Sequence, residues 1–293
     1  MSECEVLLAG EDTSSRAAGV WRSVDGGRTL TLHSAVPLAR VRNVLREQAD
    51  WWLAGEDALG VPSLLRSSDG GVTWTTWRPP MDRLVDIALS SAGVIAVGAQ
   101  AGAAAIALFR RDNTWVKASI VEAELADTRM STLAAAGGVV VVGGVGPDGA
   151  VALLSGDGGS SFRVSRPGNQ FTSVLASGIL SDDVVIGGFS GQRVESGKAT
   201  SAILRSGTTN WTPLGLPDGI AMTSLSCQRA CVAALATGRG DALLRLGATE
   251  ASWGSVLLPV LARPAVVERI VLTRGNHGYA FGTGGPLLRV GLE

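Results

Sequence analysis

A short motif with the sequence Ser-Ser-Asp-Gly-Gly-Val-Thr-Trp, at residues 67–74, recurs along the chain and constrains its fold more than any other feature. Similar stretches occupy residues 23–30 and 155–162. Their aspartates lie 44 positions before and 88 positions after the aspartate of the central copy, and 88 is two periods of 44. Periods of about 40 to 50 residues are typical of propellers and related repeat arrays. The spacing therefore predicts a repetitive all-β fold.

Degenerate copies of the motif fill the remaining periods. They lie at residues 110–115, 205–211 and 245–253, and each ends in tryptophan. A short apolar strand, in most copies ending in arginine, precedes each turn, and it occurs seven times along the chain: at residues 20–22, 64–66, 108–110, 153–155, 203–205, 244–245 and 287–289. Seven copies of this third strand predict seven blades.

We expect one β-propeller domain over residues 1–293, with seven four-stranded antiparallel sheets and the recurring turn between strands C and D of each. The expected blades cover residues 1–34, 41–79, 83–118, 129–165, 170–214, 221–258 and 268–293. The B strands are almost continuously apolar and end in glycine, which favours sheets buried on both faces. The first repeat lacks a recognisable strand A and the last stops after strand C, which leaves the closure of the ring open.

Composition and charge limit the function. A net charge of −1 argues against a nucleic-acid surface, because phosphate binding requires a basic excess. No apolar run reaches the roughly 18 residues of a membrane span, and the first residues do not form a signal peptide. We therefore expect neither nucleic-acid binding nor membrane insertion.

The Ser-x-Asp-Gly-Gly-x-Thr-Trp units resemble those of Asp-box propellers, also called bacterial neuraminidase repeats. In style the chain is most similar to the non-catalytic sialidase-like and photosystem-assembly-factor-like members. The resemblance implies a sialidase-like fold but no single activity, since function is carried by sites and not by folds. An aspartate in such a turn accepts backbone hydrogen bonds while the glycines supply positive φ angles. We interpret Asp25, Asp69 and Asp157 as structural residues.

Catalysis finds little support. The Arg-Ile-Pro motif that sialidases carry is absent, and the single tyrosine, Tyr279, lies in an apolar strand. The chain has two histidines, far apart, so neither a metal site nor a Ser-His-Asp triad is predicted, and no cofactor is expected. The string Ala-Gly-Glu-Asp at residues 54–57 repeats at residues 9–12, which favours shared ancestry over a pair of catalytic carboxylates.

The expected A strands begin with a recurring polar position. Alignment of these strands places four arginines and one glutamine there: Arg42, Arg83, Arg129, Arg269 and Gln170. The A strands of a propeller line its channel, so these side chains are predicted at one channel mouth. Guanidinium groups suit carboxylate or phosphate recognition. The alternative is that each arginine pairs with a local acid on a solvated rim.

Two cysteines bear on the cellular compartment. Cys227 and Cys231 flank a three-residue turn between two expected strands, within reach of a disulfide. The arrangement is similar to a cysteine hairpin of exported relatives of this propeller group. A disulfide favours an oxidising, periplasmic or extracellular location, whereas two free thiols would fit the cytoplasm.

These observations predict a non-catalytic binding or scaffold module, with a protein partner held at the arginine-bearing mouth. A glycan-binding, lectin-like propeller is the first alternative. A glycoside hydrolase of sialidase-like fold is the second.

Overall fold

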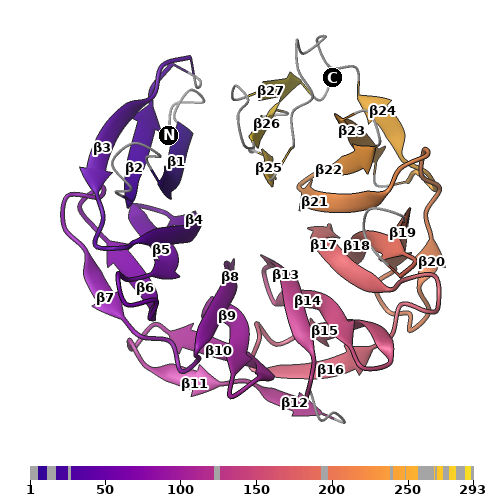
Figure 1. Cartoon of the computed structure of the whole chain (residues 1–293), viewed down its shortest axis with the longest axis horizontal. Coiled ribbons are helices and arrows are strands. Elements are labelled where there is room, and N and C mark those ends of the chain that lie inside the picture. Colours follow the sequence, from indigo (N-terminus) through magenta and orange to yellow (C-terminus); the bar gives the residue numbers. More distant parts are fainter. Residues whose placement is uncertain are drawn as a thin grey trace. The chain divides into compact units, whose positions relative to one another are not determined.

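The structure is a computed structural model. It describes residues 6–11, 18–25, 28–121, 126–192, 197–237, 240–247, 249–256, 267, 269–272, 277–281 and 288–291. These residues form 27 β-strands in seven sheets, and no helix is found among them (Figure 1). The all-β class and the expected number of blades are confirmed. In the described part of the chain no helix is long and apolar enough to cross a membrane.

The chain divides into two compact units, and the first covers residues 1–118. It contains three sheets whose strands follow one another in chain order. The first sheet comprises β1 (Val6–Glu11), β2 (Ala18–Ser23) and β3 (Thr31–Ala35). The second comprises β4 (Arg40–Glu47), β5 (Asp50–Glu56), β6 (Pro62–Ser67) and β7 (Thr75–Trp77). The third comprises β8 (Arg83–Ser90), β9 (Gly93–Gln100), β10 (Ala103–Arg110) and β11 (Trp115–Lys117).

The second unit covers residues 119–293 and contains four sheets. One sheet has β13 (Arg129–Ala136), β14 (Val139–Gly146), β15 (Gly149–Ser155), β16 (Ser161–Ser165) and, at its edge, β12 (Ser119–Val121). The next has β17 (Ser173–Leu180), β18 (Asp183–Ser190), β19 (Lys198–Leu204) and β20 (Thr212–Pro213). The last two have β21 (Ala221–Cys227), β22 (Ala230–Thr237), β23 (Gly240–Gly247) and β24 (Gly254–Val256), then β25 (Arg269–Leu272), β26 (His277–Phe281) and β27 (Leu288–Gly291).

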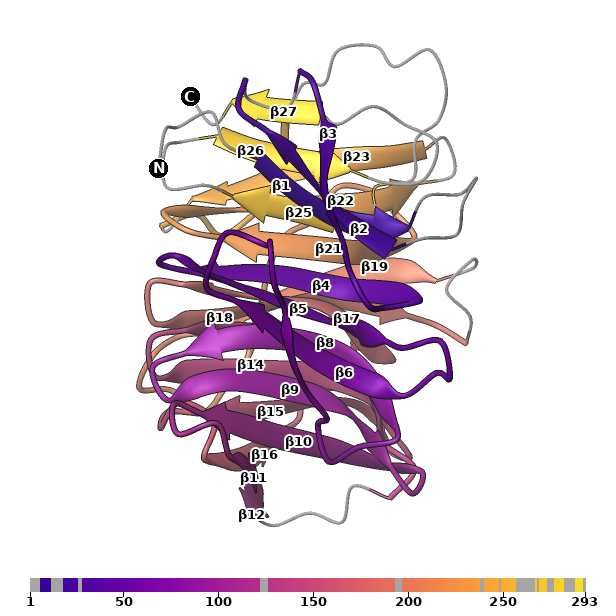
Figure 2. The same cartoon turned by 90° about the vertical axis from the view of Figure 1, so that its left-hand side faces the viewer.

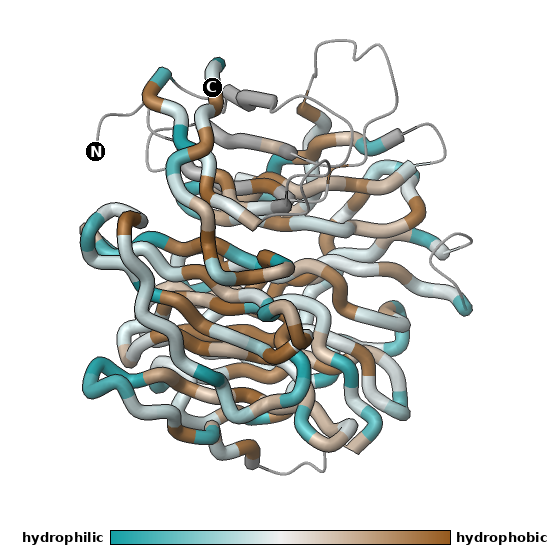
Figure 3. Tube along the Cα trace, turned by 60° about the vertical axis from the view of Figure 1, so that its left-hand side comes forward, coloured by the Kyte–Doolittle hydropathy of each residue, from teal (hydrophilic) through white to brown (hydrophobic). Residues whose placement is uncertain are grey.

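Within each unit the sheets pack face to face through the apolar residues of their middle strands. Strand β5 shows how this works, because successive side chains of a strand point to opposite faces. Trp51 and Leu53 join the core shared with the first sheet, while Trp52 and Ala54 join the core shared with the third. All four are at most 5% exposed. Figure 3 shows hydrophobic positions along the strands and hydrophilic positions at many turns. The near-continuous apolar strands are therefore explained by burial on both faces.

Strand β12 departs from the four-stranded plan. Ser119–Val121 pairs in parallel with residues 161–163 of β16, and the Ser119 amide donates to the Ser160 carbonyl at 3.0 Å (Figures 1 and 2). A similar parallel bridge joins Gly215 to Ser252, where the Trp253 amide donates to the Gly215 carbonyl at 2.9 Å. The segment leaving one outer strand thus adds to the outer edge of the next sheet, which covers backbone groups that an open edge would expose.

The three full copies of the recurring turn share one hydrogen-bond pattern. In the central copy Asp69 accepts from the Thr73 hydroxyl at 2.6 Å, from the amides of Val72 and Thr73, and from the Ser67 hydroxyl at 2.7 Å. Gly70 and Gly71 have φ angles of 72° and 91°, in the left-handed region that favours glycine. The turn closes strands β6 and β7 into a hairpin.

The same acceptor role recurs in the two other copies. Asp25 accepts from the Thr29 hydroxyl at 2.7 Å, and Asp157 accepts from the Ser161 hydroxyl at 2.6 Å. Thr29, with its hydroxyl first and its amide second, holds the pKa of the Asp25 carboxyl well below its usual range. Partial burial raises the pKa of Asp157, but the hydroxyl and amide of Ser161 outweigh it and the pKa falls to about 2. These contacts engage the carboxylates in the turns themselves.

Candidate functional site

Strand register shows which arginines occupy equivalent positions. Five of the sheets have a β-bulge near the start of their first strand, and the bulge lies after Val41 in β4, after Leu84 in β8 and after Met130 in β13. Counting from the bulge, the equivalent residues that begin these strands are Arg40, Arg83 and Arg129. Arg42 is the bulged residue itself, so it corresponds to Val85 and Ser131.

The backbone supports this assignment independently. At the matching end of the second strand, a methyl group placed on Gly55, Gly98 or Gly144 would lie 2.0, 1.8 or 2.2 Å from a carbonyl oxygen. Those oxygens belong to Arg40, Arg83 and Arg129 respectively.

The register corrects the alignment for Arg42, which occupies the bulge and not the position of Arg83 and Arg129. A β-bulge adds one residue to one strand, and such an insertion cannot be seen from residue types alone. Gln170 lies in a turn before β17, and Arg269 lies opposite Phe281 in β26. The side chain of Arg269 lies outside the described residues.

The local environment divides these arginines into two kinds. Arg40 and Arg42 both pair with Glu56, at 3.6 and 2.8 Å. Glu56 lies directly opposite Arg40 in the register, whereas Ala99 lies opposite Arg83 and Val145 lies opposite Arg129.

The acids closest in sequence to Arg83 bind other groups. Asp82 accepts from the Ala101 amide at 2.6 Å, and Asp86 accepts from the Asn43 side chain at 2.6 Å. Arg83 and Arg129 are exposed, and neither forms an ion pair within the described ranges. They are therefore available to an external anion.

The repeated Glu-Asp string has a structural role in its second copy. Glu56 holds the two arginines, and Asp57 accepts from the amides of Val61 and Leu59 at 2.9 Å each. The Val61 amide, more than any other group, lowers the pKa of Asp57. Asp12, in the first copy, lies outside the described residues.

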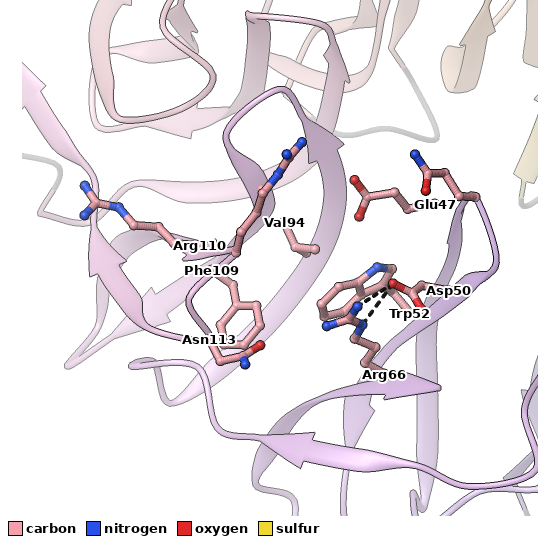
Figure 4. A pocket seen from close by; sticks show the side chains of 11 residues that line it. Glu47, Asp50, Trp52, Arg66, Val94, Phe109, Arg110 and Asn113 are labelled. Carbon is pink, nitrogen blue, oxygen red and sulfur yellow. Dashed lines mark hydrogen bonds and ion pairs between the residues drawn. The ribbon is translucent and has the colours of Figure 1, made fainter. Parts of the chain in front are cut away.

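A cavity of about 260 Å³ lies at the opposite end of the strands, between the second and third sheets of the first unit (Figure 4). Its walls come from the β4–β5 turn, the start of β9 and the β10–β11 turn, so it lies on the same end of the sheets as the recurring turn at residues 67–74. Two further cavities on this end use the same turns; one is lined by His33 and Trp51, and the other shares Arg66 and Asn113 with the first.

The floor of this cavity is aromatic and its wall is charged. Trp52 and Phe109 meet edge to face with ring centroids 5.8 Å apart. The Arg66 guanidinium lies 5.2 Å from the Trp52 ring centroid and donates two hydrogen bonds to Asp50, at 2.5 and 3.1 Å (Figure 4). The ion pair fixes Arg66 over the ring, which is the geometry of a cation–π contact.

Trp52 also has an unmet hydrogen-bond donor. Trp52 is 5% exposed, and its indole Nε1, like those of Trp74 and Trp115, is buried without an acceptor among the described residues. A buried donor without a partner costs roughly 1–3 kcal/mol. Such groups in a native protein call for an explanation, and an external acceptor is one.

The repeated arginine at the end of strand C was visible in the sequence, but its significance was not. Arg66 and Arg205 pair with acids at the start of the neighbouring strand, Asp50 and Asp183, at 2.5 and 2.6 Å. Arg110 follows the same pattern of residue types, yet its sheet has Gly93 at the facing position and provides no acid there. A sequence signal that could have located the cavity is the repeated arginine at the end of strand C in a sheet whose neighbouring strand does not begin with an acid.

Cys227 and Cys231 lie opposite each other in the β21–β22 hairpin, and their sulfur atoms are bonded at 2.00 Å. Cys231 is fully buried and belongs to the core between β17–β20 and β21–β24. The bond therefore links the two ends of a tight turn at the edge of that core.

The sheets described above define a β-propeller. The chain is similar to two solved propellers over nearly its whole length. One structure shows YCF48 bound to a D1 peptide, and its sequence is 18% identical to this chain. The superposition has a TM-score of 0.67 and covers 100% of this chain and 90% of that one. The other is YCF48 from Cyanidioschyzon merolae, with 16% identity, a TM-score of 0.65 and coverage of 99% and 97%. No protein-family model and no curated protein sequence matches the chain.

Proposed function

We propose that this chain is a non-catalytic propeller that binds an extended, acidic segment of a protein partner. The fold likeness to a propeller bound to a peptide supports the class of ligand. The observation that carries the proposal is made in each unit by itself: Arg83 in the first unit and Arg129 in the second are exposed, and their facing residues are alanine and valine. Arginine binds carboxylates through two parallel hydrogen bonds, so such side chains favour an acidic segment.

Two finer assignments accompany this proposal. The hydrogen bonds of Asp25, Asp69 and Asp157 support membership of the Asp-box superfamily. The bonded pair Cys227 and Cys231 supports an oxidising, extracytoplasmic compartment.

Selection from a random peptide display library tests the function. We expect acidic peptides to be enriched on the wild-type chain, and the double variant Arg83→Glu, Arg129→Glu to lose their binding at least tenfold, on the order of the loss of two charge-assisted contacts. Arg229→Glu, which reverses an exposed arginine in the β21–β22 turn, is the matched control and should bind as wild type does. Selection of no peptide, or equal losses in both variants, would contradict the proposal.

A further inference from the structure

We propose that the Trp52 cavity binds one carboxylate group of the partner, either on a side chain or at a chain end. This inference rests on the proposed function, and within the first unit it places a second contact at the other end of the strands from Arg83. The cavity belongs to the first unit alone.

The first argument is charge. Two acids and three arginines line the cavity, and one acid, Asp50, is already bound to Arg66. This leaves Glu47 against Arg110 and Arg111, which are both exposed and form no ion pair within the described ranges. Arg110 also interacts electrostatically with Asp112 of the same turn, so Arg111 is the cation of the cavity that is left for an external anion. The cavity therefore has an excess of cationic donors and favours an anion.

The second argument is the indole of Trp52. Nε1 can only donate a hydrogen bond, so the group that satisfies it must be an acceptor. Asp50, which also lines the cavity, is oriented by Arg66 through two hydrogen bonds (Figure 4). A carboxylate from outside has two oxygens, one for the indole and one for an arginine, which matches the two kinds of donor present.

The third argument is size. A water molecule takes about 30 Å³ of liquid, so a cavity of 260 Å³ holds the volume of several waters. This is enough for one carboxyl-bearing side chain, and it lies below the range of about 300–1,000 Å³ that encloses a larger organic ligand. Phe109 and Val94, at 2% and 1% exposed, provide an apolar surface for the methylene groups of that side chain.

Nuclear magnetic resonance of the ¹⁵N-labelled chain can detect the contact directly through the indole N–H signals. Two probes carry the carboxylate differently: N-acetyl-glutamate N-methylamide on a side chain, and N-acetylglycine at a chain end. N-acetyl-glutamine N-methylamide is the neutral control. The Trp52 signal is assigned as the one that is lost in Trp52→Phe. We expect this signal to shift saturably with one of the acidic probes and not to shift with the neutral probe. The probe that acts identifies the source of the carboxylate.

Variants of exposed Arg111 and half-buried Glu47, neither of which belongs to the core, keep the test independent of folding. Arg111→Gln should weaken binding of the acidic probe about tenfold, as expected for a lost charge-assisted hydrogen bond. Glu47→Gln should strengthen binding of the same probe, because it removes a like charge from the cavity. No shift with either acidic probe, or an equal shift with the neutral probe, would overturn the inference. Because the display selection depends on Arg83 and Arg129, peptide binding that persists while the probes fail would reject this site and keep the proposed function.

Discussion

An acid across the β4–β5 ladder engages the arginines at the start of β4, whereas the residue that faces Arg83 is not an acid. Glu56 binds Arg40 because it lies directly across the β4–β5 ladder, and alanine replaces it across from Arg83. Exposed ion pairs contribute little to stability, so the exchange of glutamate for alanine changes binding capacity more than folding. The turn aspartates show the opposite case, since their acceptors are fully used within the turn.

The lowered pKa of Asp157 predicts how stability depends on pH. An unperturbed aspartate carboxyl has a pKa of 3.8, and the pKa of folded Asp157 is about 2, so the unfolded chain binds the proton more tightly. The contribution of this carboxylate is fully present above about pH 4 and is lost as the pH falls through about 2. Urea unfolding between pH 2 and 6 should show a smaller loss on acidification in Asp157→Asn than in wild type. Asp182→Asn, at an exposed residue, should keep the wild-type profile.

The close approach at the bulges predicts a severe effect of one methyl group. In Gly144→Ala the new Cβ would lie 2.2 Å from the Arg129 carbonyl oxygen, and a backbone atom cannot move aside easily. We expect a loss of roughly 2–4 kcal/mol in the free energy of unfolding, measured by chemical denaturation. Gly156→Ala is the control, since nothing lies within 4 Å of its added Cβ, and it should change stability by less than about 0.5 kcal/mol. Equal effects would contradict the register described above.

Neighbouring sheets are held together by polar contacts at the bulges as well as by apolar packing. Asn43 donates to Asp86 and to the Ile87 carbonyl on the next first strand, and the Ser131 hydroxyl donates to the Val174 carbonyl. In the hairpin of β21 and β22 a covalent bond adds to such contacts. The turns and edges of these elements therefore fix the register that packing alone would leave free to slip.

The disulfide should contribute measurable stability. A bond that closes a loop of this length restricts the unfolded chain by about 2 kcal/mol in the chain-entropy account. The double variant Cys227→Ser, Cys231→Ser should unfold at correspondingly lower urea, and a reductant should lower the midpoint of wild type but not of the variant. A wild-type midpoint that is insensitive to complete reduction would contradict this expectation.

At the scale of the whole molecule, charge is balanced overall and uneven locally. The net charge is −1, so long-range attraction of an acidic segment is not expected from the chain as a whole. Any attraction must arise from local arginines that lack an internal partner. Salt screens such exposed charges over about 10 Å at 0.1 M and about 3 Å at 1 M.

Binding of a selected acidic peptide should therefore weaken with salt. Between 0.05 and 0.5 M NaCl we expect the Kd for wild type to rise about tenfold, as two exposed ion pairs are screened. Arg83→Gln combined with Arg129→Gln should bind more weakly and respond less to salt. Isothermal titration calorimetry measures both quantities, and an identical salt response in the double variant would show that other groups attract the peptide.

The fold class, the number of sheets and the local hydrogen bonding of the recurring turn could all be predicted from the amino-acid sequence alone. This was possible because glycine, aspartate and apolar residues act through local geometry that repeats in every sheet. The tertiary structure decided which residues are available for binding. A bulge shifts the register by one residue, so Arg40 and not Arg42 is equivalent to Arg83. Glu56 faces Arg40 on the neighbouring strand, whereas Ala99 faces Arg83. The Trp52 cavity is likewise built from turns of two neighbouring sheets, around residues 47–50 and 110–113. Packing between sheets brings these turns together, and local sequence does not encode such contacts.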